Sequence, residues 1–177
     1  MVTQNSSSFP AVTITLSGDI VITTPTNSIG NYTFSSLADG QTYTVTPTKA
    51  NFSFGPKSSP ETLSGSNISG VNFAALVQED LGCGTLVSNQ SVTIVNQATG
   101  FSPKNLSISV GDVVKWHNND SIDHTVTSGT SPTPDGVFDS GHVTSGSNYC
   151  VKFIDPTHAY PYFCSIHTTM TGTVTVP

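Results

Sequence analysis

A cysteine, a histidine and a methionine lie close together near the end of the chain, within P-Y-F-C-S-I-H-T-T-M. Cys164, His167 and Met170 are each three positions apart, and they offer a thiolate, an imidazole and a thioether. Soft sulfur together with imidazole suits copper better than magnesium or calcium. The residues before Cys164 alternate as in a β-strand, with Tyr160, Tyr162 and Cys164 on one face. We therefore expect Cys164 to point inward at a strand end, with a short loop returning His167 and Met170 toward it.

A trigonal copper site needs a second histidine, and the segment K-W-H-N-N-D-S-I-D-H-T-V supplies His124. It follows a predicted strand and a turn rich in Asn and Asp. His124, Cys164 and His167 with a weak axial Met170 make the His2Cys set of an electron-transfer copper centre. Zinc is the main competing metal, because it also binds Cys and His. Zinc has little use for a thioether, so Met170 favours copper.

The stretch from about Cys83 to Pro177 resembles the cupredoxins, the family of plastocyanin and amicyanin. The resemblance is carried by F-S-P-K-N-L-S-I-S-V-G-D-V-V-K-W, by the D-H-T-V that contains His124, and by Y-F-C-S-I-H-T-T-M. The short gap between His167 and Met170 is similar to the ligand loop of amicyanin and pseudoazurin. The resemblance implies a Greek-key sandwich that holds one copper ion and carries single electrons, and it does not imply an enzyme.

The resemblance also implies roles for neighbours of the ligands. Family members often have Asn after the upstream histidine, where this chain has Thr125, and Ser165 follows the cysteine as in plastocyanin. Thr125, Ser165 and Tyr162 are expected around the ligands, where hydrogen bonds to sulfur and local polarity tune the potential. Ile166 replaces a Pro that is common in this loop. The electron is expected to pass through His167 to a redox partner protein, such as a cytochrome or a copper enzyme.

Three further histidines are expected to lie away from copper. His117 ends a strand, His142 follows a glycine in a polar loop, and His158 lies in the turn D-P-T-H. A multicopper enzyme would need another set of histidines in a second domain, and no histidine precedes His117. The chain by itself is therefore not expected to be a nitrite reductase or an oxidase.

The composition predicts an all-β protein with two sandwich domains. The chain of 177 residues suits two domains of about 75 to 100 residues each. Arginine is absent, and Thr, Ser, Val and Gly dominate, which favours β-branched strands joined by tight turns. No apolar run reaches the roughly 18 residues of a transmembrane helix. The first ten residues, M-V-T-Q-N-S-S-S-F-P, lack the basic and apolar regions of a signal peptide.

If Cys164 is a ligand, Cys83 and Cys150 remain. A disulfide between them fits an oxidising compartment, in the periplasm or outside the cell. It would contribute roughly 3–4 kcal/mol in the loop-entropy model. Two reduced thiols are the alternative.

The formal net charge of −6 argues against binding to nucleic acid. Acidic residues, among them Asp112, Asp120 and Asp135, are concentrated in the second half of the chain. Most such surfaces only keep a protein soluble. The alternative is that they attract a basic redox partner.

Residues 1–76 are predicted to form the first sandwich. Runs such as A-V-T-I-T-L, I-V-I-T-T, Y-T-F-S-S-L and Y-T-V-T-P-T are separated by turns rich in Gly, Asn and Asp. This segment resembles the carboxypeptidase-regulatory-like module of bacterial surface proteins, which implies a fold and not an activity. Such modules usually begin with one more strand, and Met1–Pro10 offers no match. A missing strand would leave a sheet edge open to Met1–Pro10, to the other domain or to a second molecule, so the oligomeric state stays open.

Residues 77–177 are predicted to form the copper-binding sandwich, after a polar linker over residues 75–84. Gly111–Asp112 is expected to be a hairpin turn. The stretch over residues 128–146, rich in Ser, Pro and Asp, is expected to be either an exposed loop or a loop with an edge strand. Strands are expected at 91–95, 105–110, 113–116, 124–127, 149–153, 160–164 and 171–176.

Three functions are open on the sequence. Single-electron transfer between larger redox partners fits the ligand set best. The second is a copper-binding or copper-delivery module of a cell-surface or secreted protein, and the third is an adhesive or spacer element that has kept a metal. A visible spectrum with Cu(II) separates the copper functions from the spacer, and the electron self-exchange rate separates a shuttle from a carrier.

Overall fold

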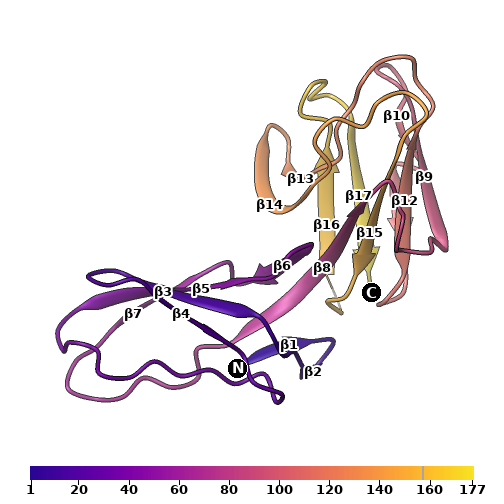
Figure 1. Ribbon diagram of the computed structural model, residues 1–177. Helices are drawn as coiled ribbons and strands as arrows, with labels where there is room; N and C mark the ends of the chain where they lie inside the picture. Colours follow the sequence, from indigo (N-terminus) through magenta and orange to yellow (C-terminus); the bar gives the residue numbers. More distant parts are fainter. Residues whose placement is uncertain (157) are drawn as a thin grey trace. The chain divides into compact units, whose positions relative to one another are not determined.

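The computed structural model describes residues 1–156 and 158–177, and within them every helix or strand is a β-strand (Figure 1). The chain divides into two compact units, Met1–Leu76 and Val77–Pro177. The prediction of an all-β fold is confirmed. No helix in the described part of the chain has the length and hydropathy needed to cross a membrane.

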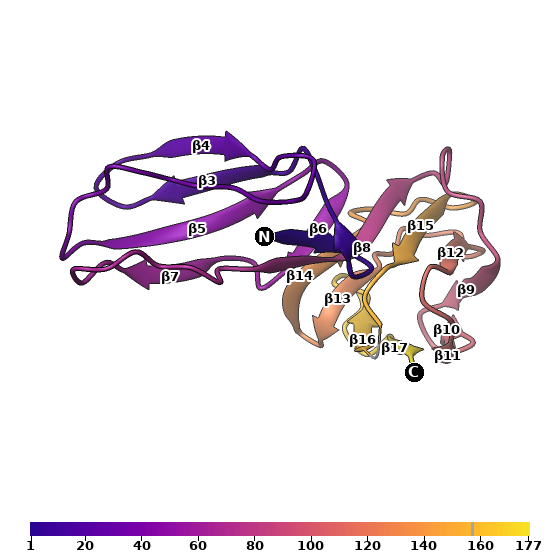
Figure 2. The same ribbon diagram turned by 90° about the horizontal axis from the view of Figure 1, so that it is seen from below.

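The first unit contains an antiparallel sheet of four strands (Figure 2). In order, these are β4 (Ile22–Pro25), β3 (Thr13–Ser17), β5 (Thr42–Thr48) and β7 (Ser59–Thr62). Threonine alternates with apolar residues in β3 and β5, so one face of each strand is apolar. Ile14, Leu16, Tyr43 and Val45 on that face are buried and belong to one hydrophobic core.

The polar segment Met1–Pro10 contains two strands, which corrects the expectation that no strand precedes Ala11. β1 (Val2–Gln4) pairs in parallel with β8 (Phe73–Leu81) and antiparallel with β2 (Ser7–Ser8). β6 (Phe52–Gly55) also pairs with β8. Val2 is fully buried, and its amide donates to the Gly30 carbonyl at 2.7 Å. Backbone pairing, and not a run of alternating apolar side chains, holds this strand in place. Its apolar pattern is therefore too short to predict the strand from the sequence.

The segment Y-T-F-S-S-L is a second correction, because its backbone joins no strand ladder. Tyr32, Phe34 and Leu37 nevertheless pack against the hydrophobic core of this unit. The Tyr32 hydroxyl also donates to the Val71 carbonyl at 2.8 Å. The alternation of apolar side chains in this segment does mark the side that faces the core, but their partial burial does not require strand pairing.

The second unit consists of strands from two sheets, whose inward side chains form its core. The first sheet runs β10 (Gly100–Ser102), β9 (Gln90–Asn96), β12 (Val113–Asn118), β15 (Asn148–Phe153) and the end of β8. The second runs β11 (Asn105–Ser107), β17 (Thr171–Val176), β16 (His158–Phe163), β13 (Thr127–Thr130) and β14 (Thr133–Asp139). The buried Trp116 of β12 packs edge-on against Tyr162 of β16, with ring centroids 5.3 Å apart.

Two connections in this region differ from expectation. Most of the predicted linker is strand β8, whose residues 77–81 pair with β15. Ala75 and Val77 are buried, but the polar run Q-E-D after them hides this alternation in the sequence. Gly111–Asp112 does not form a hairpin, because β11 pairs with β17 while β12 pairs with β9 and β15.

The stretch 128–146 follows the second of its two expected alternatives, a loop with an edge strand. It contains a strand pair, β13 and β14, at a sheet edge.

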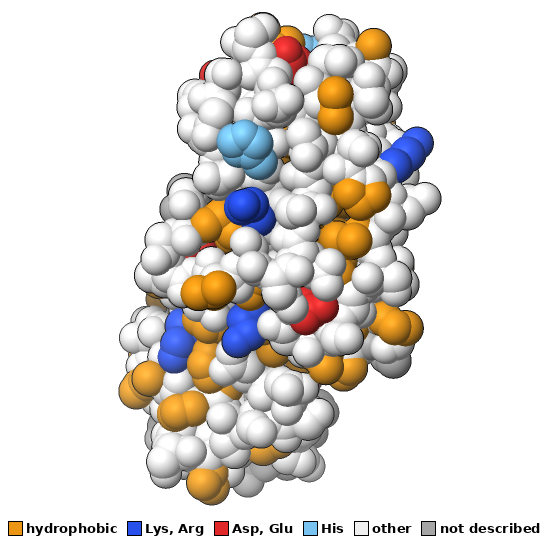
Figure 3. All heavy atoms as spheres, turned by 90° about the vertical axis from the view of Figure 1, so that its right-hand side faces the viewer, with side chains coloured by type: hydrophobic (Ala, Val, Ile, Leu, Met, Phe, Trp, Pro, Cys, Tyr) orange, Lys and Arg blue, Asp and Glu red, His pale blue; other side chains and the backbone are white. Residues whose placement is uncertain are grey.

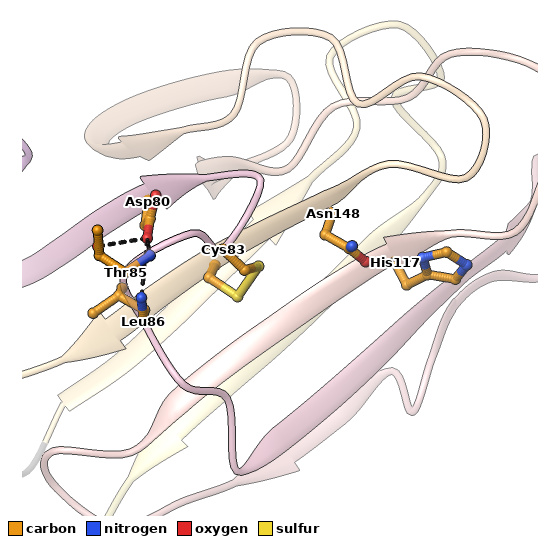
Figure 4. The surroundings of a disulfide bond; sticks show 7 residues. Asp80, Cys83, Thr85, Leu86, His117 and Asn148 are labelled. Carbon is orange, nitrogen blue, oxygen red and sulfur yellow. Dashed lines mark hydrogen bonds between the residues drawn. A yellow bond between two sulfur atoms is a disulfide. The ribbon is translucent and has the colours of Figure 1, made fainter.

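Cys83 and Cys150 form a disulfide in the structure, with their Cα atoms 5.1 Å apart (Figure 4). The bond ties the turn that follows β8 to strand β15. Beside it, the Asp80 carboxylate accepts hydrogen bonds from the Thr85 hydroxyl and amide, both at 2.6 Å. These bonds, the hydroxyl first, lower the pKa of Asp80.

Charged side chains are sparse and make up 9% of the chain. On the face shown in Figure 3 they are scattered among neutral side chains. Acidic groups on that face do not form a continuous patch. This face therefore gives no support to electrostatic attraction of a basic partner.

Candidate metal centre

Three predicted ligands, two from the segment after β16 and one from far upstream in the sequence, meet at one point. Cys164 Sγ lies 3.7 Å from His124 Nδ1 and 3.7 Å from His167 Nδ1. The two Nδ1 atoms are 3.2 Å apart. His124 and Cys164 are fully buried, whereas His167 is partly exposed. Among the described residues, these three form the one group of His, Cys and acidic side chains placed to hold a metal.

The spacing of the donor atoms fits a small ion bound between them. Zinc binds imidazole nitrogen at about 2.0 Å and thiolate sulfur at about 2.3 Å. At those lengths a trigonal arrangement separates nitrogen from sulfur by about 3.7 Å, which is the distance seen for both pairs. Met170 lies near the three donors and is buried, so a thioether completes a soft donor set. That set suits copper.

The loop between Cys164 and Met170 is closed at its base by backbone hydrogen bonds. Cys164 follows β16 directly, and Met170 immediately precedes β17. The Cys164 amide donates to the Met170 carbonyl at 3.0 Å, and the Met170 amide donates to the His167 carbonyl at 2.9 Å. Because β16 and β17 are paired in register, the loop begins and ends on a rigid support.

His124 is held by its backbone and by its ring. It forms an isolated antiparallel bridge with Val143, with backbone bonds of 3.2 and 2.8 Å. Its Nε2 lies 3.0 Å from the Asp120 carboxylate, so its Nδ1 faces the other two ligands. Such a carboxylate fixes the orientation of a ligating imidazole. The hydrogen bond to His124 is the largest cause of a lowered pKa at Asp120.

The cysteine sulfur accepts one backbone hydrogen bond. The Thr125 amide donates to Cys164 Sγ at 3.3 Å. The Thr125 hydroxyl in turn accepts a bond from the Ser165 amide at 2.7 Å. Thr125 and Ser165 thus join the segments that follow His124 and Cys164. Tyr162 lies in the aromatic core, and burial raises its pKa to about 12.

The three other histidines have partners outside this group. Their nearest polar contacts are Asn148 for His117 at 2.9 Å, Asp123 for His142 at 3.1 Å, and Asp155 for His158 at 3.6 Å. Sequence reasoning missed Asp120 as the partner of His124. Its position four residues upstream, in the same turn, is the signal that could have suggested it.

The fold and the donor set together define a β-sandwich protein with a soft metal centre. The family described as copper binding proteins, plastocyanin/azurin family, matches residues 88–177, and the chain belongs to this family. Its members are generally electron carriers rather than catalysts. Copper is accordingly the metal of this protein.

Solved structures of similar proteins cover half of the chain or slightly more. A purple cupredoxin from Nitrosopumilus maritimus is 31% identical, with 50% of this chain and 100% of that chain covered and a TM-score of 0.46. The oxidized form of an amicyanin mutant is 20% identical, with 58% and 99% covered and a TM-score of 0.48. No curated protein matches the chain.

Proposed function

We propose that His124, Cys164, His167 and Met170 bind one copper ion and that the protein carries single electrons between redox proteins. The observation that carries this proposal is the convergence of two imidazoles and a thiolate at the spacing of a trigonal site. Membership of the plastocyanin/azurin family supports it.

Bound copper would supply a one-electron change between Cu(I) and Cu(II). The chain contributes a rigid arrangement of donors, since ligands that move little suit both oxidation states. The bridge between His124 and Val143 holds one ligand. The backbone bonds at the base of the Cys164–Met170 loop hold the others. The amide bond from Thr125 to sulfur stabilises the thiolate.

The electron would pass through His167, which is partly exposed while His124 and Cys164 are buried. Around it, the loop presents Ser165, Ile166, Thr168 and Thr169, all uncharged and exposed. An uncharged surface can dock a partner without desolvating an unpaired charge. A redox protein, such as a cytochrome or a copper enzyme, is the partner that this surface fits.

We also propose the assignment of residues 1–76 to a carboxypeptidase-regulatory-like module and of residues 77–177 to a cupredoxin domain. The two compact units support these limits, and the four-stranded antiparallel sheet supports the first fold. The disulfide between Cys83 and Cys150 supports a periplasmic or extracellular location. Expression of each unit alone tests the limits, which fail if neither unit unfolds cooperatively.

Titration of the metal-free protein with Cu(II) tests the copper site. We expect an intense thiolate-to-copper band that saturates at one equivalent and is absent from Cys164→Ser. The matched control is Cys83→Ser/Cys150→Ser, which keeps Cys164 and should keep the band. A band that persists in Cys164→Ser would exclude this ligand. If the band forms but the parent shows no measurable electron self-exchange, the shuttle function fails and copper delivery takes its place.

A further inference from the structure

A line of hydroxyl groups leads from the ligand loop to an exposed carboxylate. Ser165 Oγ lies 3.0 Å from Thr125 Oγ1, which lies 2.9 Å from Thr127 Oγ1. The Thr127 hydroxyl is 3.0 Å from Asp139 Oδ1. Thr125 and Thr127 are buried, whereas Ser165 and Asp139 at the two ends are exposed. We call these three hydroxyl groups and the carboxylate the hydroxyl chain.

The carboxylate decides the direction of every bond in the hydroxyl chain. Carboxylate oxygens only accept hydrogen bonds, and a hydroxyl has one proton and two acceptor sites. Thr127 must therefore donate to Asp139. Since the Thr127 hydroxyl proton goes to Asp139, Thr127 can only accept a hydrogen bond from Thr125. The Thr125 proton is then used as well, so Thr125 can only accept a hydrogen bond from the Ser165 hydroxyl.

This direction also satisfies Thr125 completely. Its oxygen accepts from the Ser165 amide at 2.7 Å and from the Ser165 hydroxyl, and its proton goes to Thr127. One donor and two acceptor sites are thus all used. The opposite direction would place two acceptors, Thr127 Oγ1 and Asp139 Oδ1, against each other without a proton. Two facing acceptors are costly here, because the Thr127 hydroxyl is buried.

We propose that Asp139, acting through Thr127, orients the Thr125 hydroxyl and thereby helps to set the reduction potential of the copper site. The oxygen of Thr125 then faces the Cys164–Ser165 segment, and its proton points away from it. A negative dipole end toward the metal favours Cu(II) over Cu(I), so the oriented chain lowers the potential. Asp139 and Thr127 are positioning residues, since neither touches a ligand. This role rests on the proposed copper site.

Thr127→Val tests the middle of the hydroxyl chain, with Thr127→Ser as its matched control. Valine keeps the shape but removes the acceptor for the Thr125 proton, which can then turn toward Ser165. We expect a higher reduction potential in Thr127→Val and the parent's potential in Thr127→Ser, which keeps the hydroxyl. Equal potentials in Thr127→Val and the parent would overturn the proposal, provided that circular dichroism shows both proteins to be folded.

Asp139→Ala tests the carboxylate end of the hydroxyl chain, at an exposed position outside the hydrophobic core. Loss of its negative charge alone raises the potential through space, so the substitution is made in the parent and in Thr127→Val. Coupling through the chain predicts a larger upward shift in the parent than in Thr127→Val. An equal shift in both backgrounds would show that Asp139 acts by charge alone, and would overturn its positioning role.

A measurement without copper separates the hydroxyl chain from the copper site. In metal-free Thr127→Val, the reoriented Thr125 proton competes with the Ser165 amide, so that amide should exchange with deuterium roughly five- to tenfold faster. This change corresponds to the loss of about one typical hydrogen bond. An unchanged deuterium exchange rate of the Ser165 amide would show that the hydroxyl chain does not orient Thr125. If the parent protein showed no thiolate-to-copper band, the proposed function would be overturned. The deuterium exchange rate of the Ser165 amide would still test the hydroxyl chain.

Discussion

Ile166→Lys should slow electron self-exchange, because it places a charge on the loop through which electrons are proposed to leave. Ile166 is 45% exposed and follows Ser165 directly before His167. In self-exchange two copies meet at this loop, so the two introduced lysines would approach each other. At about 10 Å and an effective dielectric constant of about 20, two like charges repel by about 1.7 kcal/mol. That energy corresponds to a rate about 15- to 20-fold lower.

Val110→Lys is the matched control. Val110 is 40% exposed and lies between β11 and β12, at the opposite end of β12 from the segment that leads to His124. The six residues of β12 span about 20 Å. Both substitutions change the net charge equally, so the ratio of the two rates isolates the position of the charge. NMR line widths in mixtures of the Cu(I) and Cu(II) proteins give both rates.

The reasoning also predicts a dependence on salt. The screening length falls from about 10 Å at 0.1 M to about 3 Å at 1 M ionic strength. The rate of Ile166→Lys should therefore recover partly toward that of Val110→Lys in high salt. Equal rates for the two variants at low salt would refute exit through the His167 loop.

Three more predictions concern stability and the axial ligand. Cys83→Ala/Cys150→Ala should lower the free energy of unfolding by about 4 kcal/mol in the loop-entropy model, since the bond spans 67 positions; an unchanged urea midpoint would contradict this. Burial raises the pKa of Glu79, so its carboxylate costs stability as the pH rises above the pKa of an unfolded Glu. Glu79→Gln should therefore gain stability over the parent as the pH rises above about 4, and a pH-independent difference in chemical denaturation argues against it. Met170→Leu should keep copper but raise the reduction potential, and voltammetry that shows the parent's value would remove Met170 from the site.

The ligand types and their chemistry could be predicted from the sequence. Cys164, His167 and Met170 lie within one short segment, so their proximity is a local property. The alternation of Tyr160, Tyr162 and Cys164 likewise showed that Cys164 would be inward, and all three are buried. Such patterns are readable because a strand turns every second side chain to the same face.

The strands that carry no clear alternation could not be predicted in the same way. β1 contains one fully buried apolar side chain, Val2, and β8 continues through the polar run Q-E-D. Both are strands because their backbone groups pair with neighbours that are distant in sequence. Y-T-F-S-S-L shows the converse, since its apolar side chains are partly buried against the core without a ladder.

The surroundings of the ligands were decided by the tertiary structure alone. The sequence showed that His124 was available, but the bridge to Val143 and the contact with Asp120 hold its ring. The Thr125 amide reaches a sulfur 39 positions away, and Asp139 reaches Thr127 because β13 and β14 are paired. A hydrogen bond requires its two atoms to lie about 3 Å apart. Periodicity tells which face of a strand a side chain occupies, but the register between strands decides which side chain it meets.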